Sequence, residues 1–311
     1  MRNFFYTKSP TVTTLLQEVD SARTTTLTHI HPLQTELELQ WRASINRIYY
    51  SFLITGRMVS DKQIELILNP FSVQKKHQYE DQITNYKQLY DYLHLHWYAN
   101  PNQVQAEDVS FLFRSFIHPS HLSNVEEIER VLLYIQSSRE HPLIQASIAP
   151  ILILSTNTSN IQLEQLARTT LLVFLYKYGY DFKKMLVLEQ FFFESKTRLD
   201  LLFQKYIRKE DNLNEWLEFM LSGILASAEY VVASLNRNAV VDDYHELTEL
   251  NDRQRQILTL LDPPGTSITN RDVQKRYRVS QITASRDLAR LTALGLLFAN
   301  GKGRSIYYTR V

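Results

Sequence analysis

The chain has 311 residues, of which 44% are hydrophobic and 22% are charged, and it contains no cysteine. This length is enough for two or three compact units, and the composition is that of an ordinary soluble globular protein. Without cysteine, a disulfide framework and a thiolate active site are both excluded. The longest apolar runs, such as Ile148–Leu154, are too short to span a bilayer, and the N-terminal segment lacks a signal-peptide pattern. We therefore expect a cytoplasmic protein with no membrane partner.

The net charge of +1 conceals an asymmetry along the chain. Residues 251–311 hold eleven Lys and Arg against four Asp and Glu, a net of +7, which leaves −6 for the first 250 residues. A basic segment on an acidic body favours a nucleic-acid partner for that segment. On charge alone, a solvated basic face without a ligand explains the asymmetry equally well.

The first 250 residues show helical periodicity and no run of alternating strands. Proline and glycine mark the breaks between the helices. We expect an N-terminal helical or extended segment over residues 1–35, an all-α domain over 36–237, a linker over 238–250 and a separate domain over 251–311. The predicted helices are Glu36–Thr55, Asp61–Leu68, Gln82–His96, Ala106–Phe116, Val125–Ser137, Leu143–Leu154, Gln162–Tyr178, Met185–Tyr206 and Leu213–Arg237.

The last 61 residues predict three helices followed by two strands. Asn251–Leu261 forms the first helix, Thr269 can cap the second, and Ser280 can cap the third, QITASRDLARLTAL. The stretch LLFANGKGRSIYYTRV then favours two strands joined by a glycine-rich basic turn. The segment resembles the winged helix-turn-helix family, which implies a small α+β domain that binds DNA.

One stripe of the third helix should face the small core: Ala284, Leu288, Leu291 and Gly295. Arg286 lies on the opposite side, near the helix end that enters the major groove in this family. Glutamine and arginine can read base edges, and basic residues on the wing can neutralise phosphates. A winged helix used only for protein contact is the alternative. The predicted DNA-binding residues are Ser280, Gln281, Ser285, Arg286, Lys302 and Arg304.

Four stretches of the helical region stand out: SFLITGRMVSDKQIELIL, EHPLIQASIAPILIL, ARTTLLVFLYKYGY and NLNEWLEFMLSG. In their order and spacing they make most of this region resemble the Fic family, whose enzymes transfer AMP from ATP to protein hydroxyls. Together they cover roughly residues 17–235. The resemblance implies an all-α Fic-like domain.

The eleven residues STNTSNIQLEQ occupy the place of the family's catalytic motif, HPFx[D/E]GNGR. Counting from His141 places Asn157 at the catalytic histidine, and counting back from Arg168 gives the same register. Thr55 stands where the family's inhibitory segment carries glutamate. The remaining altered motif positions are Ile161 at the metal-binding acid, Gln162 and Glu164 at the glycines, Leu163 at the asparagine and Gln165 at the phosphate-binding arginine.

These replacements remove the family's chemistry. Asparagine cannot accept a proton from a hydroxyl at neutral pH, so no general base remains at position 157. Isoleucine offers no oxygen to Mg²⁺. Non-glycine residues hinder a close approach of backbone amides to phosphate, and Glu164 adds negative charge there. We predict no catalytic residue, no metal and no cofactor.

Other candidate groups carry weaker signals. Arg168 could bind an anion, although a salt bridge is the simpler interpretation. His94 and His96 are two apart and point to different helix faces, which disfavours a metal site. The run Phe191–Phe193 indicates core or a subunit interface.

The sequence therefore predicts a DNA-binding protein, a transcriptional regulator whose inactive Fic-like domain serves dimerisation or senses a protein partner. The first alternative is a Fic-type protein adenylyltransferase with an atypical site. The second is a protein-interaction scaffold without DNA binding.

Overall fold

The computed structural model describes residues 5–28, 33–68, 78–117, 125–155, 161–207, 212–242, 250–261, 266–293, 296–301 and 303–310. The chain divides into two compact units, one made of residues 1–29 and 40–232 and the other of residues 30–39 and 233–311. Two long helices, α2 (Leu33–Ile54) and α11 (Asn214–Asp242), contribute residues to both units.

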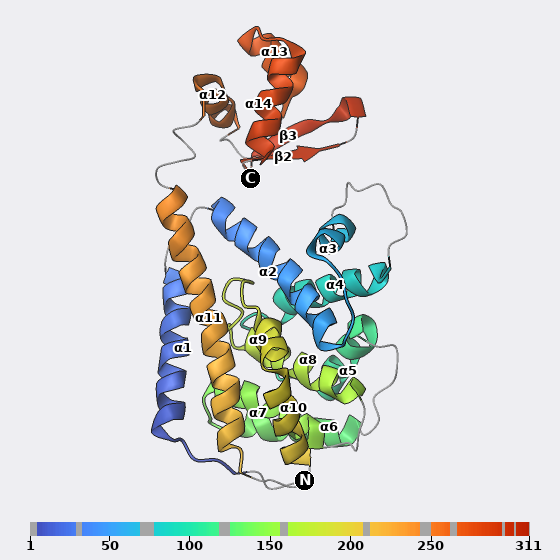
Figure 1. Cartoon of the computed structure of the whole chain (residues 1–311), viewed down its shortest axis with the longest axis vertical. Coiled ribbons are helices and arrows are strands. Elements are labelled where there is room, and N and C mark those ends of the chain that lie inside the picture. The colour runs from blue at the N-terminus through green and yellow to red at the C-terminus, as the bar shows by residue number, and fades with distance from the viewer. Residues whose placement is uncertain are drawn as a thin grey trace. The chain divides into compact units, whose positions relative to one another are not determined.

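The first unit is helical throughout its described elements, so the expected all-α body is confirmed (Figure 1). A π-helix, η1 (Phe113–Ile117), follows α5. Besides α2 and α11, the helices are α1 (Pro10–Thr28), α3 (Asp61–Leu68), α4 (Glu80–Trp97), α5 (Ala106–Leu112), α6 (Val125–Ser137), α7 (Pro142–Ser155), α8 (Ile161–Lys177), α9 (Leu188–Glu194) and α10 (Lys196–Ile207).

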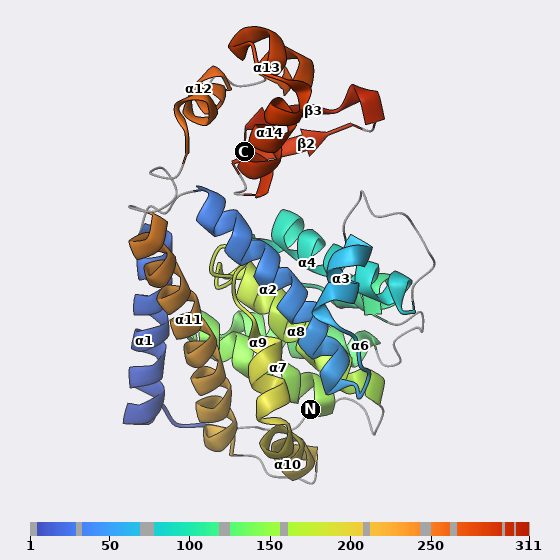
Figure 2. The same cartoon turned by 45° about the horizontal axis from the view of Figure 1, so that its top comes forward.

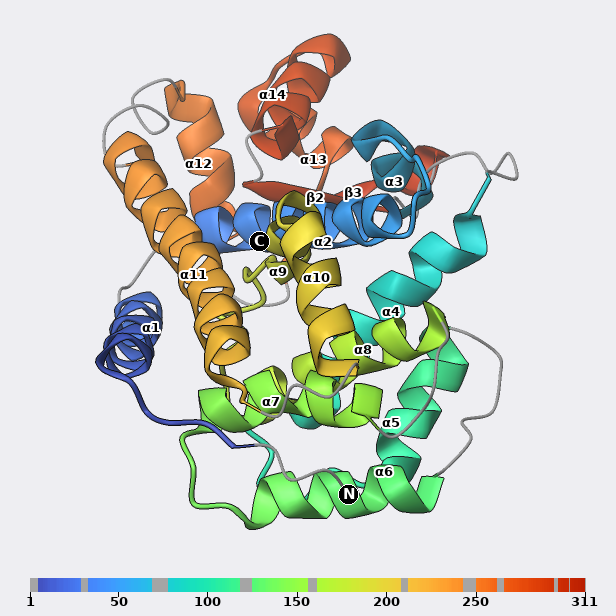
Figure 3. The ribbon, with the colours of Figure 1, turned by 60° about the horizontal axis from the view of Figure 1, so that its bottom comes forward.

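Helix α7 lies at the centre of this unit. Every residue from Leu143 to Leu154 is buried, as expected for a helix that is apolar on all sides. It packs against α8, α6 and α10, whose arrangement Figure 3 shows from below. The indole Nε1 of Trp216 on α11 donates to the carbonyl oxygen of Ser147 at 2.6 Å, which ties α11 to this central helix.

Polar contacts fasten α1 to the chain around residue 180. The guanidinium Nε of Arg23 donates to the carbonyl oxygen of Gly179 at 2.7 Å, and the hydroxyl of Tyr180 donates to Asp20 at 2.6 Å. The Nε2 atom of His141 lies 3.1 Å from the other carboxylate oxygen of Asp20. Because Asp20 has two partners from distant segments, α1 has a defined position in this unit.

Several predicted boundaries are wrong. Met185–Tyr206 is not one helix, because α9 ends at Glu194 and α10 begins at Lys196. The predicted helix Ala106–Phe116 changes from α to π geometry at Phe113. Helix α11 continues to Asp242, so the first five residues of the expected linker are helical.

Within the described residues, the segment Asn214–Asn236 of α11 is long and apolar enough to cross a bilayer by length and composition. Half of that segment is buried inside the protein, including Trp216, Leu221 and Ile224.

The described C-terminal elements are three helices and a three-stranded sheet (Figure 2). The strand order is β1-β3-β2, and both pairings are antiparallel. The sequence analysis missed the two-residue strand β1, in which Ile268 pairs with Tyr308. The elements are α12 (Asp252–Leu260), β1 (Ile268–Thr269), α13 (Asn270–Tyr277), α14 (Gln281–Ala293), β2 (Leu297–Asn300), the 3-10 turn η2 (Gly303–Ser305) and β3 (Tyr307–Arg310).

Side-chain caps start the three helices, and the sequence predicts those at Thr269 and Ser280, whereas Asn251 was expected within the first helix. Asn251 accepts from the backbone amide of Gln254 at 2.9 Å, and Thr269 accepts from that of Asp272 at 3.3 Å. Ser280 accepts from the amide of Thr283 at 3.2 Å. Such caps satisfy amides that have no partner within the helix.

The expected core stripe of α14 is confirmed for Ala284, Leu288 and Leu291, each fully buried, whereas Gly295 lies outside the described residues. These side chains pack with Ile257 of α12 and Val273 of α13. Gly301 ends β2 with φ of +90°, and a Cβ there would lie 2.4 Å from the carbonyl oxygen of Ser305. The turn between β2 and β3 therefore requires glycine at this position.

Candidate functional site

Part of the altered motif lies outside the described residues. This holds for Asn157, and nothing is described of the side chains of Ile161, Gln162 and Leu163 at the start of α8. Glu164 and Gln165 lie in the first two turns of α8 and are half-buried. Thr55, at the expected inhibitory position, donates its hydroxyl to the carbonyl oxygen of Phe52 at 2.8 Å, so it closes the end of α2.

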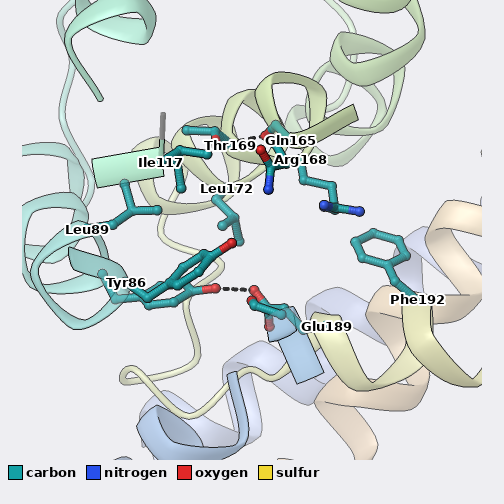
Figure 4. A pocket seen from close by; sticks show the side chains of 11 residues that line it. Tyr86, Leu89, Ile117, Gln165, Arg168, Thr169, Leu172, Glu189 and Phe192 are labelled. Atoms are coloured by element: carbon teal, nitrogen blue, oxygen red, sulfur yellow. Dashed lines mark hydrogen bonds between the residues drawn. The ribbon is translucent and has the colours of Figure 1, made fainter. Parts of the chain in front are cut away.

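Gln165 and Arg168 line a cavity of about 30 Å³ (Figure 4). Ser51 of α2 lines the same cavity as these two residues of α8. The cavity therefore brings together two segments that are far apart in the sequence. The remaining lining residues are Tyr86, Leu89 and Tyr90 of α4, Ile117 of η1, Thr169 and Leu172 of α8, and Glu189 and Phe192 of α9.

Glu189 supplies a buried carboxylate to this cavity. Its side chain is 5% exposed, and its Oε1 atom accepts a hydrogen bond from the hydroxyl of Tyr90. Its Oε2 atom is buried and has no hydrogen-bond partner among the described residues. Burial raises the pKa of Glu189, while the Tyr90 hydrogen bond and the charge of Arg47 oppose that rise. When ionised, this carboxylate would repel a phosphate group.

Arg47 is a buried cation whose charge acts on this carboxylate. Its guanidinium lies 4.6 Å from the ring centroid of Tyr90 and donates to the hydroxyl of Tyr176 at 3.0 Å. It also donates to the carbonyl oxygen of Lys184. Phe182, Lys183 and Lys184 all have positive φ, so Arg47 holds a left-handed turn of non-glycine residues, which is unfavourable by itself.

Arg168 is half-buried and extends toward Phe192 in Figure 4. It makes no hydrogen bond or ion pair with a residue of the described ranges. Its charge does act at a distance, because it opposes the rise in pKa that burial causes in Tyr86 and Glu189. The direct salt bridge expected for Arg168 is therefore not present among the described residues, and anion binding by Arg168 stays a prediction.

Among the described residues, this cavity is small. A volume of about 30 Å³ holds one or two water molecules, whereas ligand pockets measure roughly 300–1,000 Å³. In the part of the chain that the structure describes, no three His, Asp or Glu side chains gather as metal ligands would. His94 instead contacts Asp181, with Nδ1 and Oδ2 3.2 Å apart, and His96 stacks on Tyr92.

The outward face of α14 is the second candidate site. Gln281, Ser285 and Arg286 are exposed, while Ser280 uses its hydroxyl as the helix cap. The side-chain amide of Asn270 donates to the hydroxyl of Ser285 at 2.8 Å, which links α13 to this face. Lys302 lies outside the described residues, and of Arg304 only the backbone, in η2, is described.

Asp287 is a buried acid on α14 that was not predicted from the sequence. Asp287 is 3% exposed and accepts from Nε of Arg253 at 2.5 Å and from the side-chain amide of Gln254 at 2.9 Å. Burial alone would raise the pKa of Asp287, but these hydrogen bonds lower it below the ordinary value. The spacing of Asn251 and Gln254, a capping box, indicates that the Gln254 side chain turns back toward the start of α12.

No protein-family model and no curated protein match the chain. The fold does match solved structures. One is a Fic family protein from Desulfovibrio desulfuricans, with a TM-score of 0.61 and 13% identity over 100% of this chain and 98% of that one. Another is a variant of a Fic-1 fragment from C. elegans, with a TM-score of 0.53 and 13% identity over 71% of this chain and 72% of that one. At this identity the likeness concerns the fold, and the chain has a Fic-like fold.

Proposed function

We propose that this protein is a cytoplasmic DNA-binding transcriptional regulator whose C-terminal unit is a winged helix and whose Fic-like body has no adenylyltransferase activity. The observation that carries the proposal is the division of α14 into two faces. Ala284, Leu288 and Leu291 are fully buried, while Gln281 and Arg286 are exposed. Such a helix can enter a major groove without losing core contacts.

The arrangement of α13 and α14 supports the helix-turn-helix reading. Arg278 ends α13 in the left-handed conformation, with φ of 50°, and Ser280 caps α14 two residues later. The connection is therefore a tight turn between two packed helices. The exposed basic residues Arg271, Lys275 and Arg278 lie on α13 and this turn, where they add positive charge for phosphate contacts.

The Fic-like body would then serve dimerisation or the sensing of a protein partner. A dimer presents two DNA-reading heads, and the second head binds at a high effective concentration. The helical body is acidic, with a net charge of −6 over the first 250 residues, so it adds no attraction for DNA of its own.

The full-length chain should bind duplex DNA with an affinity that falls steeply as salt rises. Fluorescence anisotropy over a salt series measures this. Replacing Lys302 or Arg304 by Ala should weaken binding to all sequences and reduce the salt slope by about 1 each. Replacing Gln281 or Arg286 by Ala should cost roughly 1–3 kcal/mol and relax the sequence preference.

Arg114→Ala is a matched control, because Arg114 is an exposed arginine on η1 of the acidic body. Its affinity and salt slope should equal those of the unmodified chain. A chain without salt-sensitive DNA affinity at low ionic strength would be a protein-interaction scaffold instead.

The purified protein should transfer no AMP from ATP to itself or to lysate proteins. The physical reason is the missing general base, metal ligand and phosphate-binding arginine, together with the carboxylate of Glu189 in the cavity. Asn157→His should also be inactive, because charge stabilisation by metal and arginine stays absent. Radiolabelled ATP with Mg²⁺ measures the activity.

The alternative function, an adenylyltransferase, is favoured by one observation, the retained Arg168. The variant Arg168→Ala tests this alternative. Labelling by the unmodified chain that disappears in this variant would establish the enzyme and refute the inactive body.

A further inference from the structure

An isoleucine stands in the middle of the polar face of α14. Ile282 is 65% exposed, more than Phe298 or Tyr307 in the same unit. It therefore contributes little to the core. As a β-branched residue in a helix, it also has a lower helix propensity than the alanine or glutamine that would suit an exposed position.

The position of Ile282 is fixed relative to the polar side chains around it. Ser285 and Arg286 follow at three and four residues, so all three lie on one helical face. Asn270 donates to the hydroxyl of Ser285 at 2.8 Å and to the carbonyl oxygen of Gln281 at 3.5 Å. These bonds anchor the first turn of α14 to the start of α13, on either side of Ile282.

The side chains of Gln281 and Arg286 are available for contacts. Within the described ranges, neither side chain has a hydrogen bond or ion pair. The face thus combines a free amide and a free guanidinium with one apolar side chain, and it belongs to a segment of net charge +7. A polyanion that carries a single apolar group complements this combination.

We propose that Ile282 recognises the C5 methyl group of a thymine in the major groove, an inference that rests on the proposed DNA-binding function. The thymine methyl is the apolar group among the base edges of that groove. Arg286 then faces a guanine on the same side of the helix. One helical turn rises about 5.4 Å, against about 3.4 Å per base pair, so this guanine lies within roughly two base pairs of the thymine.

The experiment begins with selection of duplexes from a randomised library by the full-length chain. Each thymine of the selected duplex is then replaced by uracil, which removes the methyl group and keeps the base pairing. At one position the replacement should weaken binding about fourfold, the factor that corresponds to one buried methyl-sized group.

Ile282→Ala supplies the second arm of a double-mutant cycle. This variant should bind the thymine duplex about as weakly as the unmodified chain binds the uracil duplex, and it should not distinguish the two. Alanine has the higher helix propensity, so the variant should keep its fold, which circular dichroism checks. Leu95→Ala, which truncates a 77% exposed apolar side chain on α4, should keep the full discrimination.

Two results would overturn the inference while leaving the proposed function intact. One is a selected duplex in which no uracil replacement changes the affinity. The other is an Ile282→Ala variant that binds DNA and still discriminates thymine from uracil as the unmodified chain does. If the unmodified chain shows no salt-sensitive DNA binding, the proposed function itself is refuted.

Discussion

Arg47→Met should destabilise the helical unit by about 3–5 kcal/mol, the cost of removing one partner from a buried charge network. The replacement removes a buried cation that acts on Glu189, and it leaves the carbonyl oxygen of Lys184 without its donor. All three tryptophans, Trp41, Trp97 and Trp216, lie in this unit, so fluorescence-detected urea unfolding reports on it alone.

The double variant with Glu189→Gln should recover part of that loss, because the carboxylate that needs compensation is gone. The two effects should therefore be non-additive. An Arg47→Met variant that loses less than about 1 kcal/mol, with no recovery in the double variant, would show that the network is not coupled in this way.

The loss of unfolding free energy in the Arg47→Met variant should also depend on pH. Burial raises the pKa of Glu189, so the folded state binds its proton more tightly than the unfolded state does. The contribution of this group to stability is therefore highest below the unfolded pKa, roughly 4.3, and falls as the pH rises toward the folded value. Loss of Arg47 raises the folded pKa further. The difference in unfolding free energy from the unmodified chain should accordingly be larger at neutral pH than near the unfolded pKa.

The sequence predicts helix positions well where polar caps and prolines bound an amphipathic run. Asp61–Leu68 and Val125–Ser137 have the predicted ends for this reason. The break between α9 and α10 has a weaker signal, because the run MLVLEQFFFESKTRLDLLFQKY contains neither glycine nor proline and offers only Ser195, directly before α10, as a cap candidate. Packing constrains α9 as well. A Cβ on Gly223 would lie 2.3 Å from the ring of Phe191, so the contact between α9 and α11 requires glycine there.

The cavity could be predicted only in part. The spacing of the motif predicted that Gln165 and Arg168 lie close together, and both line the cavity. The sequence did not predict the contacts among Arg47, Tyr90 and Glu189, because these residues lie on three helices that are far apart in the sequence. Periodicity identifies which side of a helix is buried, but it does not indicate which buried charges meet. Strand β1 was missed for a related reason, since two residues become a strand only by pairing with β3.

Leu288→Ala and Arg286→Ala, two residues apart on α14, should separate folding from DNA binding. Leu288 is fully buried, so its truncation should cost about 2–5 kcal/mol. A unit of about 60 residues has a stability on the order of 3–9 kcal/mol, so this loss unfolds a substantial fraction of the C-terminal units. Arg286 is exposed and unpaired among described residues, and its truncation should leave the fold unchanged.

Amide hydrogen exchange over residues 250–311, measured together with DNA affinity, distinguishes the two variants. Leu288→Ala should lose both exchange protection and affinity, whereas Arg286→Ala should lose affinity with protection intact. If Leu288→Ala loses its protection and still binds DNA as the unmodified chain does, α14 is not the DNA-reading helix. Because the buried and exposed faces alternate within one turn, any DNA-reading role of α14 depends on the core that orients it. Variants on the two faces must then fail in these two different ways.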